Sequence, residues 1–442
     1  MLGFFDHKGG FMIRLKWLLV SMLAALLPAL LRAQTFSGRL TSSFYAYERS
    51  DSIGVNTGQA RGYQTFQFDF GGKEVRLRTY GQLDRDFNTR LAGDGKARMY
   101  NLSLEWKNLA KRVDVQLGRQ PVFGGSAVGT IDGAQIKVKA SRWLRLKAFG
   151  GGLLPSDQRL KLIDDLDKNY MAGGQAVLTP NPDLSIGLSF FDKRQLRPGY
   201  DALRADSIGN VLTLFVEPED RAYRVGSVDA SWFVSPKASF YARSDYDFHA
   251  EQITRAELST RAEVSRQLIV TGNYIFRSPR LPWNSLFSAF NVEDNHELEG
   301  GFYFQYKPAL RFYGNVAGIF YDGDNSRRFT VGTDLKYGGL SYVHRSGYAG
   351  NLDGVNASLH YPLQRGRFLP NVQLSWAAYK LDAGEAERVS LFSGAAGLLV
   401  RPHKTLTFDG QLQLLHNRYY SNDVRFLFRM QYWFFTKLGA SS

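Results

Sequence analysis

The sequence contains no cysteine among its 442 residues. This absence excludes a disulfide framework, thiolate metal sites, a cysteine nucleophile and a lipoprotein anchor. After residue 34 no run approaches ~18 apolar residues, which excludes a transmembrane helix. Charged residues make up 22% of the chain and aromatic residues 14%, a composition too aromatic and too sparsely charged for a disordered protein.

The N-terminal segment is organised as a secretory signal. Arg14 and Lys16 precede an apolar run over residues 17–31, and Ala33 supplies a small residue for cleavage. A basic segment, a short apolar segment and a small residue before the cleavage point are the parts of a signal peptide. We therefore expect residues 1–33 to be a signal peptide, with a buried N-terminal helix as the alternative.

Apolar and polar residues alternate along most of the remaining chain. Ala256, Leu258 and Ala262 fall on one face of a segment, and Glu257 and Arg261 fall on the other. Alternation with period two is typical of strands that have one apolar and one polar face. The pattern predicts about 22 strands, with about 18 to 20 as the alternative.

Short and long connections alternate between the predicted strands. Residues 141–142 and 265–266 form short turns, whereas residues 152–168 and 193–221 form long connections. Short periplasmic turns and longer outer loops are typical of outer-membrane barrels. In lipid every backbone polar group must be bonded internally, so such a sheet must close.

The predicted fold class is therefore all-β: a closed antiparallel up-and-down transmembrane β-barrel over residues 34–435. We expect residues 436–442 to form a C-terminal periplasmic tail. Aromatic residues support the barrel, because they gather near both ends of the strands, as two interfacial girdles would require. They include Trp106, Trp143, Trp232, Tyr306, Tyr337 and Tyr361 near the short turns, and Phe248, Phe276, Phe320 and Tyr379 near the opposite ends. A soluble β repeat protein is the alternative.

The last predicted strand ends with the aromatic sequence RMQYWFF over residues 429–435. In this the chain resembles Gram-negative outer-membrane porin-like β-barrel proteins, and the aromatic end looks like their terminal β-signal. The resemblance implies an outer-membrane location and a signal read by the barrel-insertion machinery at Tyr432, Phe434 and Phe435. A weaker, local likeness to alginate-export-type porins lies in the sequence GRQ at residues 118–120, followed by DG at residues 132–133.

No plug domain separates the first predicted strand from the signal segment, although barrels of this size are often plugged. The lumen must then be open, filled by loops and side chains, or occupied by a partner. The connection over residues 193–221 is long enough to fold inward.

The face predicted to line the lumen carries charges of both signs. One interpretation is a cross-strand network of ion pairs that holds a polar lumen rigid. The other is a slightly basic pore that favours anions. Lys137, Lys139, Arg145 and Lys147 are the strongest candidates, since they lie on neighbouring predicted strands with few carboxylates nearby. The remaining candidates for basic pore-lining residues are Arg76, Arg78, Arg255, Arg261, Arg425 and Arg429.

One group of residues admits an enzymatic interpretation. Asp245, Asp247 and His249 share one face of a predicted strand near its outer end, where they could polarise water. The simpler interpretation is three polar side chains at the mouth of a barrel, because no partner motif accompanies them. We therefore expect no enzymatic activity, no cofactor and no metal site. The basic residues are dispersed along strands, so we expect no nucleic-acid partner.

The sequence thus predicts a porin-like outer-membrane channel for passive diffusion of small polar or anionic solutes. Two alternatives stay open: an occluded barrel that serves as a scaffold or partner-binding component of an outer-membrane complex, and a rim hydrolase that uses Asp245, Asp247 and His249. The expected partners are outer-membrane lipids, the barrel-insertion machinery and small polar solutes. Assembly into a homo-oligomer is left open.

Overall fold

The computed structural model describes residues 35–52, 55–88, 97–196, 199–205, 211–216, 221–279, 294–347, 350–380, 387–418 and 423–437. The predicted signal peptide, residues 1–33, lies outside the described residues. Most of the described chain is strand.

The strands of the first half alternate between short turns and longer connections. They are β1 (Thr35–Ser52), β2 (Val55–Gly71), β3 (Val75–Asp86), β4 (Ala97–Leu109), β5 (Val113–Gly124), β6 (Ala127–Lys139), β7 (Leu144–Leu153), β8 (Tyr170–Asn181), β9 (Leu184–Arg194), β10 (Tyr200–Ala205), β11 (Val211–Val216) and β12 (Arg221–Ser235).

The second half continues the same arrangement, with one short 3-10 helix in a turn. Its elements are β13 (Ala238–Asp247), β14 (Gln252–Glu263), β15 (Leu268–Arg277), β16 (Asn295–Lys307), β17 (Leu310–Tyr321), β18 (Asn325–Leu335), β19 (Gly338–Gly347), β20 (Asn351–His360), η2 (Gln364–Gly366), β21 (Phe368–Lys380), β22 (Val389–His403), β23 (Leu406–His416) and β24 (Asp423–Lys437).

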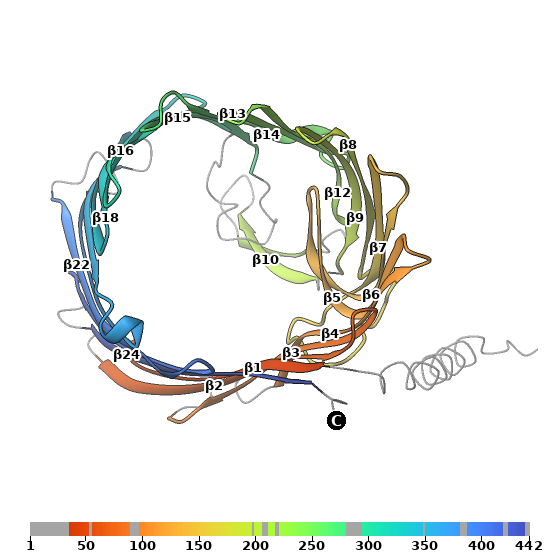
Figure 1. The fold of residues 1–442 in the computed structure, drawn as a ribbon, viewed down its shortest axis with the longest axis horizontal. Coiled ribbons are helices and arrows are strands. Elements are labelled where there is room, and N and C mark those ends of the chain that lie inside the picture. The colour runs from red at the N-terminus through yellow and green to blue at the C-terminus, as the bar shows by residue number, and fades with distance from the viewer. Residues whose placement is uncertain are drawn as a thin grey trace, which may run out of the picture.

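The sheet closes on itself (Figure 1). It has 22 strands, all pairing antiparallel with their neighbours, and β1 pairs with both β2 and β24. The pairing of β1 with β24 runs from Thr35↔Lys437 to Ala46↔Phe426, so Thr436 and Lys437 continue the last strand. The predicted fold class, a closed antiparallel barrel of about 22 strands, is confirmed.

The outer surface of the ring is apolar. Leu258, Val316 and Leu412 are among many large apolar side chains that stand exposed on it. Such exposure suits a surface that faces lipid, because in water it would be an association site. Trp232 and Phe320 are exposed at opposite ends of the strands, as the predicted girdles require. Among the described residues no helix is long and apolar enough to cross a membrane.

The ring is interrupted where β5 and β6 leave it. Pairing between β4 and β5 extends to Leu102↔Arg119, and pairing between β6 and β7 extends to Ile131↔Leu153. Beyond these points β5 and β6 pair only with each other, as far as Gly124↔Ala127. This two-stranded segment, residues 119–131, stands inside the ring (Figure 1); we call it the lumen hairpin.

Gly118 explains where the departure starts. Its φ of +107° is a conformation that side chains rarely adopt, and an added Cβ would lie 2.4 Å from the Leu102 carbonyl oxygen. Glycine alone adopts such a backbone readily and lets two strands approach so closely. The bend into the lumen therefore has its cause in one residue of β5.

An apolar cluster holds the lumen hairpin against the inner wall. Val122, Ala127 and Ile131 are buried against side chains that the wall turns inward. Those wall residues are Phe149, Leu153, Met171, Phe191 and Val225, from β7, β8, β9 and β12. Burial of this kind contributes roughly 25 cal/mol per Å² of apolar surface, so the hairpin is bound to the wall by its own core.

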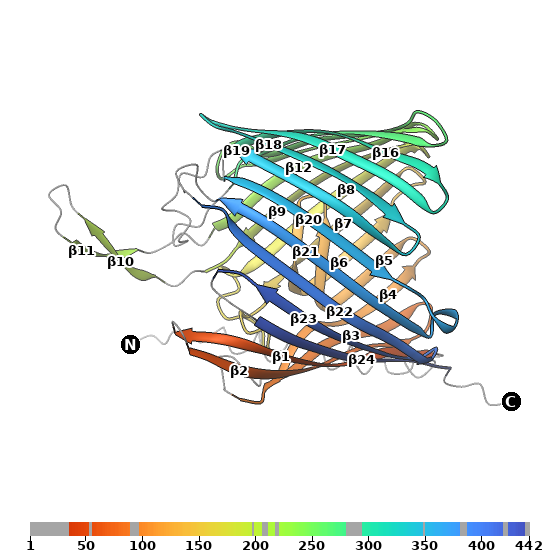
Figure 2. The same cartoon turned by 90° about the vertical axis from the view of Figure 1, so that its left-hand side faces the viewer.

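The long connection after β9, which is long enough to fold inward, does not do so in its described part. Its strands β10 and β11 form a separate two-stranded hairpin with the register Tyr200↔Val216 to Ala205↔Val211. Figure 2 shows this hairpin projecting beyond the end of the barrel opposite the C-terminus. The described part of the connection does not line the lumen, and in Figure 1 it overlaps the opening only in projection. The element that folds inward is the lumen hairpin.

Candidate functional site: the lumen

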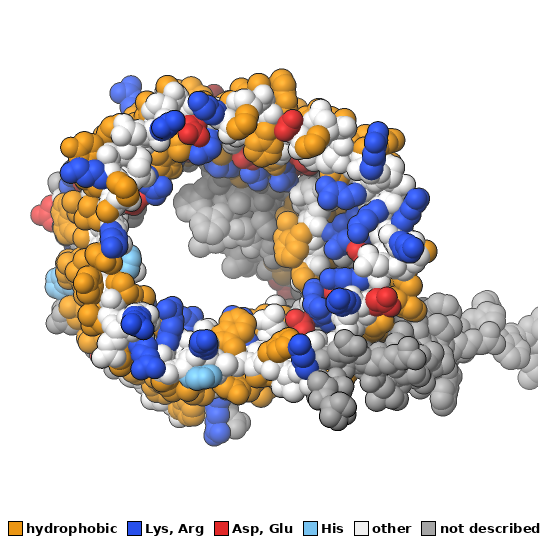
Figure 3. Space-filling view, in the orientation of Figure 1, with side chains coloured by type: hydrophobic (Ala, Val, Ile, Leu, Met, Phe, Trp, Pro, Cys, Tyr) orange, Lys and Arg blue, Asp and Glu red, His pale blue; other side chains and the backbone are white. Residues whose placement is uncertain are grey.

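Past the lumen hairpin, the part of the chain that the structure describes leaves the lumen open. Figure 3 looks into the ring from the end that carries the short turns and the end of β24, and a clear opening passes through it. The hairpin turns Phe123 and Val128, 63% and 66% exposed, away from the wall and toward this opening. It therefore narrows the passage from one side and gives the narrowed part an apolar surface.

Four cations face one another on the wall below the hairpin. Lys137 of β6 pairs directly with Lys147 of β7, and Lys139 pairs with Arg145. Their strand neighbour Ile136 is exposed on the lipid side, which places the four cations on the lumen side. Within the described part of the chain none of the four forms an ion pair with a carboxylate. Like charges placed opposite each other repel, so this surface, which we call the basic wall, is poised to attract anions.

Lys147 joins the basic wall to the lumen hairpin. Its ammonium donates a hydrogen bond to the Phe123 carbonyl oxygen and lies 5.9 Å from the ring centroid of Phe149. The cation nearest the hairpin therefore stands beside the exposed apolar side chains of Phe123 and Val128.

Most of the other predicted pore-lining cations are ion-paired. Arg78 lies 3.3 Å from Glu105, and Arg255 lies 2.6 Å from Glu257. The same holds for Arg425 with Asp423 at 2.5 Å and for Arg429 with Asp409 at 2.6 Å. Arg76 and Arg261 also lie on the lumen side, with no carboxylate within ion-pair distance in the described residues. The ten candidates thus separate into paired and unpaired groups.

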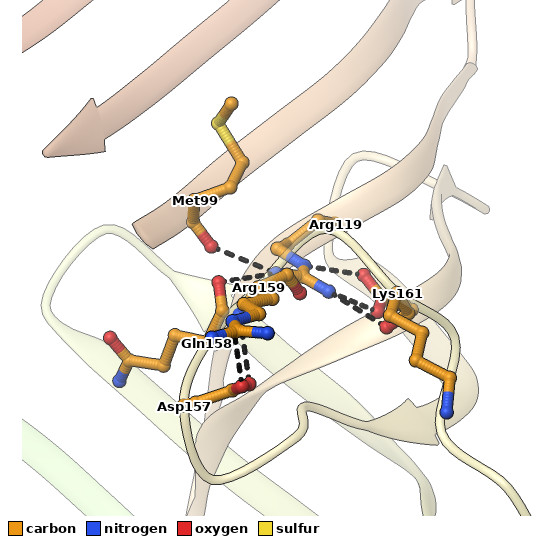
Figure 4. Close-up of polar contacts among 7 residues, drawn as sticks. Met99, Arg119, Asp157, Gln158, Arg159 and Lys161 are labelled. Carbon is orange, nitrogen blue, oxygen red and sulfur yellow. Dashed lines mark hydrogen bonds and ion pairs between the residues drawn. The ribbon is translucent and has the colours of Figure 1, made fainter. Parts of the chain in front are cut away.

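A buried arginine fixes the base of the lumen hairpin (Figure 4). Arg119 is 2% exposed, and its guanidinium binds both carboxylate oxygens of Asp132, at 2.8 and 2.7 Å. It also donates to four carbonyl oxygens, those of Met99, Gln158, Arg159 and Lys161, at distances of 2.9–3.3 Å. A planar guanidinium with five donors is suited to such a set, whereas an ammonium is not.

The same contacts provide β4 with a new neighbour where β5 has left the wall. Beyond Leu102, β4 loses β5 as its partner, and the connection between β7 and β8 takes the vacated place. Met99 donates its amide to the Gln158 carbonyl oxygen at 3.0 Å. In this connection Asp164 accepts a hydrogen bond from Lys161 at 2.9 Å, which raises the pKa of Lys161. We call Arg119, Asp132 and the four carbonyl groups that accept hydrogen bonds from Arg119 the Arg119 bracket.

The sequence carries a signal for this bracket in the positions of its two charged residues. Arg119 follows Val115 and Leu117 on the face of β5 that alternation assigns to lipid, and Asp132 precedes Ile136 on the same face of β6. Two opposite charges that face each other at lipid-side positions would be very unfavourable in a membrane. Their presence indicates that β5 and β6 leave the wall there.

The aromatic end of β24 lies at the seam of the ring. Tyr432 and Phe434 are on the lipid side, and the ring of Phe434 lies 5.0 Å from that of Phe36 in β1. Gly38 leaves room for it, since an added Cβ would lie 2.7 Å from a Phe434 ring carbon. Phe435 is on the opposite face of β24. That the insertion machinery recognises Tyr432, Phe434 and Phe435 stays a prediction.

The cluster considered as a rim hydrolase is used structurally. Asp245 binds Arg243 through two hydrogen bonds of 2.8 and 2.9 Å. Asp247 is 1% exposed and accepts hydrogen bonds from the backbone amides of His249 and Ala250 at 2.8 and 3.3 Å. These bonds shape the turn after β13 and occupy the carboxylates that would have to activate water. The described residues contain no group of side chains suited to hold a metal ion.

Comparison with known proteins finds similarity in structure alone. No protein-family model and no curated protein matches the sequence. Pseudomonas aeruginosa OccK3 (OpdO) is 10% identical with a TM-score of 0.44, over 91% of this chain and 96% of that one. P. aeruginosa OccK2 (OpdF), solved in complex with glucuronate, is 12% identical with a TM-score of 0.42, over 91% and 98%. The P pilus usher (PapC) translocation pore is 8% identical with a TM-score of 0.44, over 91% and 100%.

The architecture itself assigns the class. A closed antiparallel ring with an apolar outer surface, aromatic residues at both rims and a charged interior is the construction of a transmembrane β-barrel of the outer-membrane type. The predicted barrel fold is thereby confirmed, and the predicted outer-membrane location agrees with it.

Proposed function

We propose that the protein is a porin-like channel through which small polar or anionic solutes diffuse passively across the outer membrane. The observation that carries this proposal is the open lumen, narrowed by the lumen hairpin directly above the basic wall. The hairpin sets the width of the passage, and the four unpaired cations set its charge. No energy source or moving plug is needed for such a mechanism.

An excess of positive potential at the basic wall favours anions. Elsewhere on the inner wall Arg255, Arg425 and Arg429 are neutralised by carboxylates, so they contribute little to the field. Lys137, Lys139, Arg145 and Lys147 face the passage and form no ion pair among the described residues, although Asp114 of β5 lies across from Lys137. Clusters of Lys and Arg in a pore favour anions at close range.

The alternative of an occluded scaffold is less well supported. It requires a lumen closed by side chains or by a partner, and the opening in Figure 3 offers no support for closure by the wall itself. The rim-hydrolase alternative is also less well supported, because Asp245 and Asp247 already serve Arg243 and the turn after β13.

Planar-bilayer recording tests the proposal. Purified, folded protein should give ohmic single-channel steps, and a potassium chloride gradient should give a reversal potential of the sign that marks chloride preference. Absence of conductance from protein whose barrel is shown to be folded by circular dichroism would reject the channel. Conductance with potassium preference would reject the anion preference but keep the channel.

A further inference from the structure

A groove at the periplasmic end of the barrel is lined by cations from two turns. One turn connects β20 to β21 and contains η2, and the other connects β22 to β23. The groove has a volume of about 930 Å³, and its charged or titratable lining side chains are Arg365, Arg367, Arg401, His403 and Lys404. Figure 3 shows Lys and Arg side chains gathered at the lower left of the ring, over the turn that carries η2 in Figure 1.

The strands fix the direction in which the groove faces. Phe368 and Val400 are cross-strand partners on the lipid side, in line with exposed Val372 and Leu398. Arg401, the residue after Val400 in β22, therefore projects toward the mouth of the lumen. The Arg401 amide donates to the Arg367 carbonyl oxygen at 2.7 Å, which ties the two turns together. The groove thus lies on the rim at the short-turn end of the barrel, with Arg401 on its lumen side.

No acidic side chain lines the groove, and none in the described residues forms an ion pair with its four Lys and Arg side chains. Asp409 lies further along the wall of β23 but already binds Arg429 at 2.6 Å. Four cations on two adjoining turns without an ion-paired carboxylate repel one another, and a bound anion would reduce this repulsion.

His403 adds a directed donor. Its Nδ1 accepts a hydrogen bond from the Thr405 backbone amide at 3.3 Å and lies 2.8 Å from the Thr405 hydroxyl. Because a backbone amide can only donate, Nδ1 carries no proton, and the proton of the neutral ring is on Nε2. Its N–H group is left to bind an acceptor in the groove.

The backbone of the η2 turn is held in an unusual conformation. Gln364 and Arg365 both have positive φ, 46° and 57°, although neither is glycine. Such a conformation is unfavourable for a residue with a side chain, and the turn is kept by hydrogen bonds from the Gly366 amide to the Leu363 carbonyl oxygen at 2.9 Å and from the Arg367 amide to the Gln364 carbonyl oxygen at 3.3 Å. The presentation of Arg365 beside Arg367 is therefore built into the turn.

We propose that this groove binds a small polyvalent oxyanion, a molecule that carries several phosphate or carboxylate groups. Guanidinium groups bind both kinds of oxyanion bidentately, and a volume of this size suits a small molecule with several charges. The occupant is polyvalent because a single monovalent anion would leave three of the four cations uncompensated. The site does not depend on the lumen conducting ions.

Isothermal titration calorimetry on the detergent-solubilised full-length barrel tests the site. Inorganic tripolyphosphate and citrate are the probes, and they distinguish a phosphate-bearing from a carboxylate-bearing ligand. We expect one saturable site for at least one probe, whereas formate, a monovalent control, should bind at least about tenfold more weakly. Absence of a saturable site for both polyvalent probes at low salt would overturn the proposal, whether or not the protein conducts.

A matched pair of double variants separates a specific site from general charge. Arg367→Gln with Arg401→Gln should weaken binding about tenfold or more, because two bidentate donors are lost. Lys237→Gln with Arg266→Gln removes the same charge from two other short turns and should change affinity by no more than about twofold. Equal weakening in both, with both variants folded by circular dichroism, would reduce the effect to net charge and reject the groove as a site.

Discussion

Two parts of the inner wall differ in whether their cations are ion-paired. Along β15 to β18, Arg328 binds Glu297 at 2.6 Å and Glu299 at 2.7 Å, and Arg277 binds Glu297 at 3.2 Å. Along β6 and β7, the four cations of the basic wall face each other with no carboxylate within ion-pair distance among the described residues. The paired part stiffens the wall, whereas the basic wall generates potential in the passage.

The lumen hairpin stands on the same side of the lumen as the basic wall. The unpaired cations therefore lie where the passage is narrowed. A solute that passes the hairpin is forced toward one side of the lumen or the other. Lys147, bonded to the Phe123 carbonyl oxygen, lies on the hairpin side. Width and charge are therefore set at one place, and variants can separate the two properties.

The largest expected effect comes from breaking the Arg119 bracket. Arg119→Ala would leave Asp132 and four carbonyl oxygens without their donor and should lower the free energy of unfolding by about 3–5 kcal/mol. It should also increase the conductance or its noise, since the hairpin loses its anchor. Urea titration followed by tryptophan fluorescence, together with bilayer recording, measures both.

The matched control for Arg119 is an exposed ion pair on the opposite wall. Arg311 binds Asp334 at 2.5 Å, with both side chains more than 40% exposed. Arg311→Ala should change stability by no more than about 1 kcal/mol and leave the conductance noise unaltered. Equal effects of the two substitutions would mean that the bracket is no more than an ordinary ion pair.

A smaller effect is expected where β5 bends. Gly118→Ala forces a side chain into a backbone with φ of +107° and against the Leu102 carbonyl oxygen. We expect a loss of about 1–3 kcal/mol in unfolding free energy from the backbone strain. Gly300→Ala is the control, because nothing lies within 4 Å of a Cβ added there. If both variants are equally stable, the bend does not depend on glycine.

Removing the charge of the basic wall should make it resemble the paired wall. The quadruple substitution of Lys137, Lys139, Arg145 and Lys147 by Gln removes four cations, each worth a few tenths of a kcal/mol to an anion in wet surroundings. The chloride-to-potassium permeability ratio should fall by about fivefold, as read from reversal potentials. An unchanged ratio would place the origin of any selectivity elsewhere.

The smallest expected effect comes from making the paired wall resemble the basic one. Glu297→Gln with Glu299→Gln leaves Arg328 and Arg277 without their partners. The permeability ratio should rise toward chloride by about twofold, less than the opposite change on the basic wall, because two charges change rather than four. A shift toward potassium would contradict the view that these carboxylates neutralise the wall.

Much of the fold follows from alternation in the sequence. The faces of β14, exemplified by Leu258 outside and Glu257 inside, and the alternation of turn lengths are sufficient to predict a closed ring of this size. The pattern also places Lys137 and Lys147 on one side of two neighbouring strands. Their direct opposition required the register, which alternation does not give.

The departure of β5 and β6 from the wall could not be read from alternation in the same way. A strand keeps its period of two whether it stays in the barrel or bends away, so within residues 113–139 only Arg119 and Asp132, two charges at positions that alternation assigns to lipid, indicate the bend. The positive φ of Gly118 is not evident from its being a glycine, and the carbonyl groups that Arg119 binds come from segments distant in the sequence. The connection after β9 was likewise too ambiguous to reveal β10 and β11, whose apolar residues match a short strand as well as a loop.

The tucked position of the lumen hairpin constrains the order in which the molecule is assembled. The bracket uses carbonyl groups up to Lys161, and the apolar cluster is completed by Val225, so the described contacts that secure the hairpin are all complete by residue 225, about halfway along the chain. The last strand, β24, closes the ring against β1 and seals the lumen sideways. The lumen hairpin can therefore pack against the sheet before the barrel closes. When β24 then pairs with β1, the closed barrel already contains its constriction.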